Sequence, residues 1–224
     1  MTARDFHNNF DIEVDKTKDF EFPYILAEQK DYWLNKAQDQ FIEDRAYPND
    51  KRQLGFEQDQ QRIDDLSWIV KTASLSPTPT ATGYTLALPA DYLHLVRHSC
   101  TTTGGDTCGT HIVGGIQTTH EFINQMLKDP FWTPSADEPL YYIQGKNIVY
   151  ETKGNYTLSN VTITYIKVPV SIRLGTEYII PTTDVDCELS SHVHSDILNM
   201  AVSMVLENFE SPRYQTNLNE LNKN

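Results

Sequence analysis

The chain has 224 residues, a length that fits one domain with an insertion or two small domains. Its 31 acidic and 18 basic residues give a formal net charge of −13. That balance argues against a phosphate-binding surface, because nucleic-acid affinity rests mainly on Lys and Arg. Residues 1–20 lack the apolar core of a signal peptide, and no apolar run reaches the roughly 20 residues of a membrane span. We therefore expect a soluble protein whose three cysteines remain free thiols.

Two amphipathic helices are predicted near the N-terminus. The first, in residues 21–48, places on one stripe Leu26, Trp33, Ala37 and Phe41. The second, in residues 56–73, places on one face Phe56, Ile63, Leu66, Val70 and Ala73. The connection between them is short, which favours antiparallel packing, so residues 1–75 are expected to form a helical hairpin.

An antiparallel β region is predicted in residues 76–186. Pro77 and Pro79 interrupt the helical pattern, and short β-like runs separated by Gly, Asn and Pro follow from Tyr84 onward. The run "IQGKNI" is typical of a hairpin turn. One short helix is expected within residues 118–130, where Pro130 would stop it.

A long C-terminal helix is predicted to begin after Ser190 or Ser191, with residues 187–224 forming this helix and a docking tail. The helix is apolar around most of its circumference and needs neighbours on several sides. The candidate interface residues of helix and tail are Val193, Ile197, Met204, Phe209, Arg213, Tyr214, Leu218 and Leu221. The predicted fold class is α+β, in which the hairpin and the C-terminal helix form a bundle with an inserted antiparallel β region.

Two histidine-containing patterns raise the question of a metal site. His192 and His194 lie about 200° apart on a helix, so they do not share a metal there. The stretch "HSCTTTGGDTCGTH" offers better zinc ligands in His98, Cys100, Cys108 and His111. Strand alternation sends some of these side chains to opposite faces, so buried thiols on a hairpin remain the simpler interpretation, and zinc remains open.

Catalytic motifs are missing from the sequence. It contains no G-x-S-x-G nucleophile elbow, no phosphate-binding P-loop and no G-x-G-x-x-G fingerprint, so the residues alone give an enzyme no support, and we expect no cofactor. One segment has a single sign of charge: residues 174–212 carry seven acidic side chains and no Lys or Arg. Within it, Glu207 and Glu210 are candidates for the lining of a channel that repels phosphates.

Four phrases of the sequence resemble a known family. They are "YILAEQKDYWLNKAQDQFIEDRAYP", "LPADYLHLVRHSC", "LKDPFWTPSADEPLYYIQGKNIVYE" and "HVHSDILNMAVSMVLENFESPRYQT". In this order they resemble the neck ring proteins of crAss-like bacteriophages, the head-to-tail connectors that are similar to the adaptors of short-tailed phages. The resemblance implies a non-enzymatic virion protein of the neck or tail, assembled in the host bacterial cytoplasm.

The same resemblance implies the partners. They are further copies of the chain, commonly twelve in a ring, together with the portal protein, other neck or tail rings and DNA that passes during ejection without specific binding. The alternative is a carbohydrate- or ligand-binding β module on a helical stalk. Its support is the set of aromatic residues Phe131, Trp132, Tyr141, Tyr142 and Tyr150, which are suited to stacking on sugar rings.

Removing residues 213–224 is expected to weaken assembly without destabilising the subunit. The large apolar residues there are Tyr214, Leu218 and Leu221, too few to offset about 1–2 kcal/mol of backbone entropy per ordered residue. Their spacing of four and three makes a helical strip suited to a groove on a neighbouring subunit or the portal. Thermal unfolding and mass photometry of the truncated chain test this. Undiminished assembly would show that the tail has no docking role.

Overall fold

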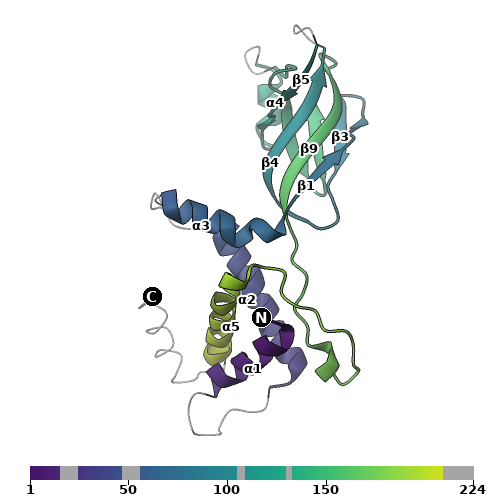
Figure 1. Cartoon of the computed structure of the whole chain (residues 1–224). Coiled ribbons are helices and arrows are strands. Elements are labelled where there is room, and N and C mark those ends of the chain that lie inside the picture. Colours follow the sequence, from purple (N-terminus) through teal and green to yellow (C-terminus); the bar gives the residue numbers. More distant parts are fainter. Residues whose placement is uncertain (16–24, 47–55, 105–108, 130–132, 209–224) are drawn as a thin grey trace. The chain divides into compact units, whose positions relative to one another are not determined.

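The computed structural model describes residues 1–15, 25–46, 56–104, 109–129 and 133–208. The chain divides into two compact units (Figure 1). A helical unit combines residues 1–69 with residues 169–224, and a β unit comprises residues 70–168. The N-terminal and C-terminal helical segments, although distant in sequence, therefore belong to one unit.

The helical unit is built on three helices that lie side by side. They are α1 (Ala3–Val14), α2 (Ala27–Ala46) and α5 (His194–Asn208) (Figure 1). Each buries one apolar face against the others, as the 3.6-residue period requires. The side chains at the centre are almost fully buried, among them Phe6, Phe10, Leu34, Ile42, Ile197 and Val205. The shorter α3 (Phe56–Leu66) and the 3₁₀ turns η1 (Ser67–Ile69), η2 (Gly175–Glu177) and η3 (Ser191–Val193) complete the unit.

Helix α1 begins with a capping box. The Thr2 hydroxyl accepts a hydrogen bond from the Asp5 backbone N–H at 3.2 Å, and Asp5 accepts one from the Thr2 N–H at 2.9 Å. Asp186 adds a further acceptor, 2.7 Å from the Ala3 N–H. Three N–H groups at the start of the helix are thus satisfied, which fixes where the chain enters the bundle.

The return from the β unit lies along a polar strip of α2. Asp31, Asn35 and Gln38, spaced four and three apart, face the segment 170–178. The Asn35 amide pairs with both backbone groups of Ile172, at 2.7 and 2.9 Å. Asp31 accepts hydrogen bonds from Leu174 N–H at 3.1 Å, the Tyr178 hydroxyl at 2.6 Å and His7 Nε2 at 2.7 Å. One carboxylate therefore joins α1, α2 and the returning chain.

The β unit consists of two sheets. One has the strand order β1-β9-β4-β5 and is antiparallel throughout, and its strands are β1 (Val70–Leu75), β9 (Thr157–Lys167), β4 (Tyr92–Thr103) and β5 (Thr110–Val113). The other has the order β2-β3-β8-β7-β6, formed by β2 (Thr78–Pro79), β3 (Gly83–Ala87), β8 (Asn147–Glu151), β7 (Leu140–Gln144) and β6 (Ile116–Gln117). All its pairs are antiparallel except the short β6–β7 pair.

The two sheets share one apolar core. Cys100, Val161 and Ile163 from the first sheet cluster with Ile148 and Tyr150 from the second, and all are at most 1% exposed. Figure 1 shows the β4 and β9 arrows of the first sheet lying across the strands of the second. Along the strands, buried positions alternate with more exposed ones, as they do in sheets that have one covered face. The predicted "IQGKNI" hairpin is confirmed, since Gln144 pairs with Asn147 and Gly145 takes φ +59°.

The α+β fold class is confirmed, but two predicted helices are too long. The expected second helix ends at Leu66, and Val70–Leu75 forms the strand β1 paired with β9. The helical spacing of Val70 and Ala73 also fits a strand, and pairing with β9 decides between the two. The helix expected in residues 118–130 is reduced to α4 (Ile123–Met126).

Asp31→Ala should destabilise the helical unit by about 3 kcal/mol or more, because three donors from two other segments, two of them buried, lose their acceptor together. Glu43→Ala, at an exposed position of the same helix, is the matched control and should change the unfolding free energy by less than about 0.5 kcal/mol. Urea unfolding followed by circular dichroism measures both. Equal effects of the two substitutions would contradict the anchoring role of Asp31.

Candidate functional site

Helix α5 carries most of the predicted interface residues that the structure describes. Val193, just before it in η3, is 2% exposed and Ile197 is 0% exposed, because both side chains pack inside the subunit's own core. These two side chains are not available to a neighbouring subunit, so we do not propose them as interface residues. Met204 is half-buried and Glu207 is exposed. The remaining candidates lie outside the described residues: Phe209, Glu210, Arg213, Tyr214, Leu218 and Leu221.

The two histidines before α5 have different environments. His194 is buried, its ring 5.2 Å from that of Phe6, with Nε2 2.9 Å from the Leu189 carbonyl and Nδ1 2.8 Å from the N-terminal amine. Burial lowers the pKa of His194, since desolvation penalises the imidazolium form. His192 instead faces away and is half-exposed. The hydrogen bonds of the pair therefore fix the start of the helix, and that the two rings do not share a metal stays a prediction.

Ser190, His192 and Asp65 form a hydrogen-bonded array. Ser190 Oγ lies 2.7 Å from His192 Nδ1, and His192 Nε2 lies 2.8 Å from Asp65 Oδ1. These are the residue types of a hydrolase triad, but Asp65 is also paired with Arg45, whose Nε lies 3.0 Å from Oδ2 without hydrogen-bond alignment. A carboxylate shared with a guanidinium supports an imidazolium less well, and Ser190 bonds a residue only two positions away at a helix start. The array ties η3 to α3.

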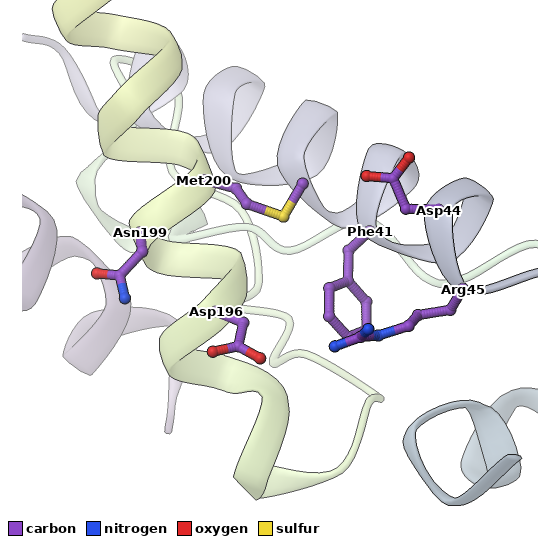
Figure 2. Close-up of a pocket in the computed structure, with 6 residues that line it drawn as sticks. All are labelled: Phe41, Asp44, Arg45, Asp196, Asn199 and Met200. Carbon is purple, nitrogen blue, oxygen red and sulfur yellow. The ribbon is translucent and has the colours of Figure 1, made fainter. Parts of the chain in front are cut away.

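A hollow of about 260 Å³ lies between α2 and α5. Figure 2 shows Phe41 and Arg45 of α2 with the guanidinium over the Phe41 ring, and Met200 of α5 extending toward α2. Asp196 lies on the first turn of α5 and Asp44 on α2, so two carboxylates border the hollow beside one cation. Because Arg45 is already held by Asp65 and Phe41, its guanidinium is not free to bind an anionic ligand in this hollow.

Three of the seven acidic side chains in residues 174–212 accept hydrogen bonds from the subunit's own chain. Asp184 accepts from the Thr176 N–H and hydroxyl, Asp186 from Ala3 N–H, and Glu188 from Val170 N–H. These carboxylates hold the returning chain in place. Glu207, exposed near the end of α5, is the acidic candidate whose side chain is open to solvent.

A second hollow of about 420 Å³ lies on α2 and is lined by Ile25, Glu28, Gln29, Tyr32, Trp33 and Asn208. Tyr32 is 60% exposed and meets the Trp33 ring edge-on, with centroids 5.2 Å apart. The Lys36 ammonium lies 5.1 Å from the centroid of Trp33. Sequence reasoning placed Trp33 on the core-facing stripe of this helix and missed the aromatic surface.

The two sheets bury two of the four other candidate ligands of a metal, His98 and Cys100. Both ring nitrogens of His98 are engaged: Nε2 donates to the Tyr150 hydroxyl at 2.6 Å, and Nδ1 accepts from Gly115 N–H at 3.2 Å. Burial raises the pKa of Cys100 to about 12, which disfavours the thiolate that a metal needs. Cys108 lies outside the described residues, and His111 pairs with Thr102 across β4 and β5.

In the part of the chain that the structure describes, no three His, Cys, Asp or Glu side chains are grouped closely enough to hold a metal ion. The same part contains no helix long and apolar enough to cross a bilayer. The free thiols described are Cys100 and Cys187.

The sequence comparisons give the protein's class. A family model described as "Phage tail ring protein 3/4" matches residues 1–216. The chain belongs to this family of phage ring proteins. It is also 25% identical over 224 residues to "Ring protein 4/5" of Bacteroides phage crAss001, an alignment that covers 91% of this chain and 92% of the relative. The predicted resemblance to ring proteins of crAss-like phages is confirmed.

The aromatic residues that favoured a carbohydrate-binding module are partly buried in the β unit. Tyr141 and Tyr150 are 5% and 0% exposed and pack around His98, so they do not form a platform for sugars. Tyr142 is half-buried against His120, and Phe131 and Trp132 lie outside the described residues. Two of the five aromatic residues that favoured a carbohydrate-binding module are thus core residues of the ring protein's β unit.

The β unit of the ring protein should lose stability in acid through His98. Burial lowers the pKa of His98 from 6.5 to about 4. The unfolded chain binds this proton first, so the contribution of the neutral ring is complete above about pH 6.5 and is lost as the pH falls toward 4. Substitution His98→Gln keeps a donor and an acceptor but does not titrate.

Urea unfolding at about pH 7 and about pH 4.5 tests this, and wild type should lose about 2–3 kcal/mol more than His98→Gln between the two conditions. The difference isolates His98 from other acid-sensitive groups because both proteins share them. Equal losses in the two proteins would show that the His98 ring protonates without opposing the fold.

Proposed function

We propose that this ring protein closes into a homo-oligomeric ring in the phage neck, between the portal and the tail, where it forms part of the conduit for the genome. The observation that carries the proposal is the family match across residues 1–216, together with alignment along 92% of the crAss001 ring protein. Its partners are further copies of the chain, twelve in the closed ring, the portal and adjoining rings. It acts as a connector during DNA ejection and has no enzymatic role.

The charge of the chain supports a conduit that does not hold DNA. The net charge is −13, and a ring multiplies that charge around its axis. Passing DNA gains affinity only where phosphates are neutralised by Lys or Arg, and residues 174–212 contain neither. Glu207 is exposed at the end of α5, which suits a position on the channel wall, and Glu210 three residues later is the companion candidate.

The folded core of the subunit supports assembly from preformed parts. The apolar face of α5 is satisfied by α1 and α2 within one chain, so the subunit does not need a neighbour to bury it. Ring closure then uses surface residues such as Met204, together with the tail residues Phe209, Arg213, Tyr214, Leu218 and Leu221. Such a subunit folds in the host bacterial cytoplasm and joins the virion afterwards.

Purified protein, alone and mixed with its portal, should form closed rings visible by electron microscopy, and mass photometry should give their copy number. In a map of the ring, Glu207 should face the channel. A protein that is strictly monomeric both alone and with the portal would overturn the ring proposal. A map that places Glu207 on the outer rim of the ring would support the ring proposal but contradict the proposal that Glu207 lines the channel.

A further inference from the structure

The loop between Leu174 and Val185 exposes two large apolar side chains at its tip. Ile179 is 84% exposed and Ile180 is 78% exposed, the two highest values among the exposed large apolar residues of the helical unit. Ile172 and Ile197 of the same unit are buried, and the exposed Ile12 and Ile63 are each 62% exposed, so Ile179 and Ile180 stand out as an adjacent pair. Adjacent exposed apolar side chains on a soluble subunit commonly mark a contact with another molecule.

The loop that carries these side chains is fixed to the helical unit. Arg173 and Val185 form a two-way backbone bridge at 3.0 and 2.8 Å, and Thr182 N–H donates to the Gly175 carbonyl at 2.9 Å. Asp184 accepts from both the N–H and hydroxyl of Thr176. The loop is therefore preorganised at its base, and its tip reaches a partner at low entropic cost.

Two further contacts hold the loop against α2 and tighten its base. Burial and the hydrogen bond to Asp31 raise the pKa of Tyr178 to about 12, so this residue remains a donor to the Asp31 carboxylate. A Cβ at Gly175 would collide with Thr182 Oγ1, so the close approach across the base requires glycine. Figure 1 shows the segment that carries η2 extending beyond the cluster of α1, α2 and α5.

A complementary surface lies on another side of the same helix. The loop is held by Asp31 and Asn35, and successive residues of a helix rotate by about 100°, so Tyr32 lies about 100° and Trp33 about 200° around α2 from Asp31. The aromatic hollow of about 420 Å³ at Tyr32 and Trp33 is thus separate from the loop.

The two surfaces differ in shape and chemistry as well as position. The loop projects two aliphatic side chains, whereas the hollow is lined by Tyr32 and Trp33 together with Glu28, and the Lys36 ammonium lies 5.1 Å from the Trp33 ring. A ring closed by rotation needs two different surfaces on each subunit, one for each neighbour. An apolar projection and an aromatic hollow on different sides of one helix satisfy that requirement.

We propose that Ile179 and Ile180 of one copy insert into the Tyr32–Trp33 hollow of the next copy, and that this contact propagates the ring. The inference rests on the proposed ring function and specifies its subunit contact. The occupant is a second copy of this chain, because the family is one of rings and the two surfaces of the contact occur on the same subunit.

Paired substitutions in the full-length chain test the contact. The loop variant Ile179→Asp/Ile180→Asp and the hollow variant Tyr32→Asp should each weaken assembly by about tenfold or more, measured by mass photometry, because each places a charge in an apolar contact. The matched controls are Ile112→Asp, an isoleucine of β5 that is also 78% exposed, and Ile63→Asp on α3, 62% exposed against 60% for Tyr32. Both controls should assemble as wild type, and all variants should keep the thermal stability of wild type.

Mixing the two defective variants gives the sharper result. The loop variant retains an intact hollow and the hollow variant retains an intact loop, so an equimolar mixture should form two-subunit complexes that grow no further. A symmetric contact of loop with loop predicts that the hollow variant pairs with itself and that no complex contains the loop variant, and this result would overturn the proposal. Variants that close rings as readily as the controls would overturn it while leaving the ring function standing.

Other outcomes would show that the ring contact lies on the tail, or that the loop contacts the portal. If Tyr32→Asp assembles normally while removal of residues 213–224 abolishes rings, the neighbour contact lies on the tail and the inference is wrong. If the loop variant forms normal rings but no longer binds the portal, the loop contacts the portal instead of a second copy. A wild-type chain that stays monomeric with and without the portal would overturn the ring function itself.

Discussion

The helical unit depends on the hydrogen bonds of one buried carboxylate. Asp31 is 3% exposed and receives donors from α1 and from the returning chain, so three segments far apart in sequence meet at its two oxygens. Asn35 and Gln38 extend this contact along the same face of α2 by pairing with the backbone at Ile172 and Val170. Backbone groups buried without partners are costly, and this strip satisfies them where no sheet or helix does. The position of the loop with Ile179 and Ile180 is therefore a consequence of polar residues on a helix that otherwise packs through apolar ones.

The β unit is organised by different forces. Its two sheets close over a core in which tyrosines and one histidine replace part of the usual aliphatic packing, and each polar tip that is buried needs a partner. His98 supplies one by joining the Tyr150 hydroxyl and the Gly115 backbone, and its ring packs 4.4 Å from that of Tyr141. Gly115 is required there because a Cβ would lie 2.7 Å from the His98 ring. Interior packing thus explains the buried part of the aromatic content that suggests a sugar-binding face. The two ring nitrogens of His98 bind Tyr150 and Gly115 of the core.

Local patterns predicted the kinds of element but not the contacts that matter for assembly. The α+β class, the β7–β8 hairpin and the long α5 follow from periodicity and turn residues. The end of α3 does not, since Val70 and Ala73 fit both a helix face and a strand until β9 supplies a partner. Asp31 and Asn35 look like the solvent side of an amphipathic helix, and only the return of a distant segment buries them. Likewise Val193 and Ile197 pack in the subunit's own core. An apolar sequence pattern does not show whether such residues are buried within one chain or between two chains, so the sequence suggested an interface.

This division between core and surface bears on how such a protein reaches a virion. An obligate oligomer buries its main apolar face only against its partners, and its isolated subunit is unstable. Here α5 completes its packing inside one chain, which leaves a folded subunit with a short list of exposed apolar positions. A small contact between preorganised surfaces is weak for one pair, but each subunit of a closed ring makes it twice, and closure adds a contact without further loss of translational freedom. In the ring proposed here, weak pairwise contacts with strong closure would keep free subunits apart and rings intact, and a nucleating surface such as the portal would decide where the ring forms.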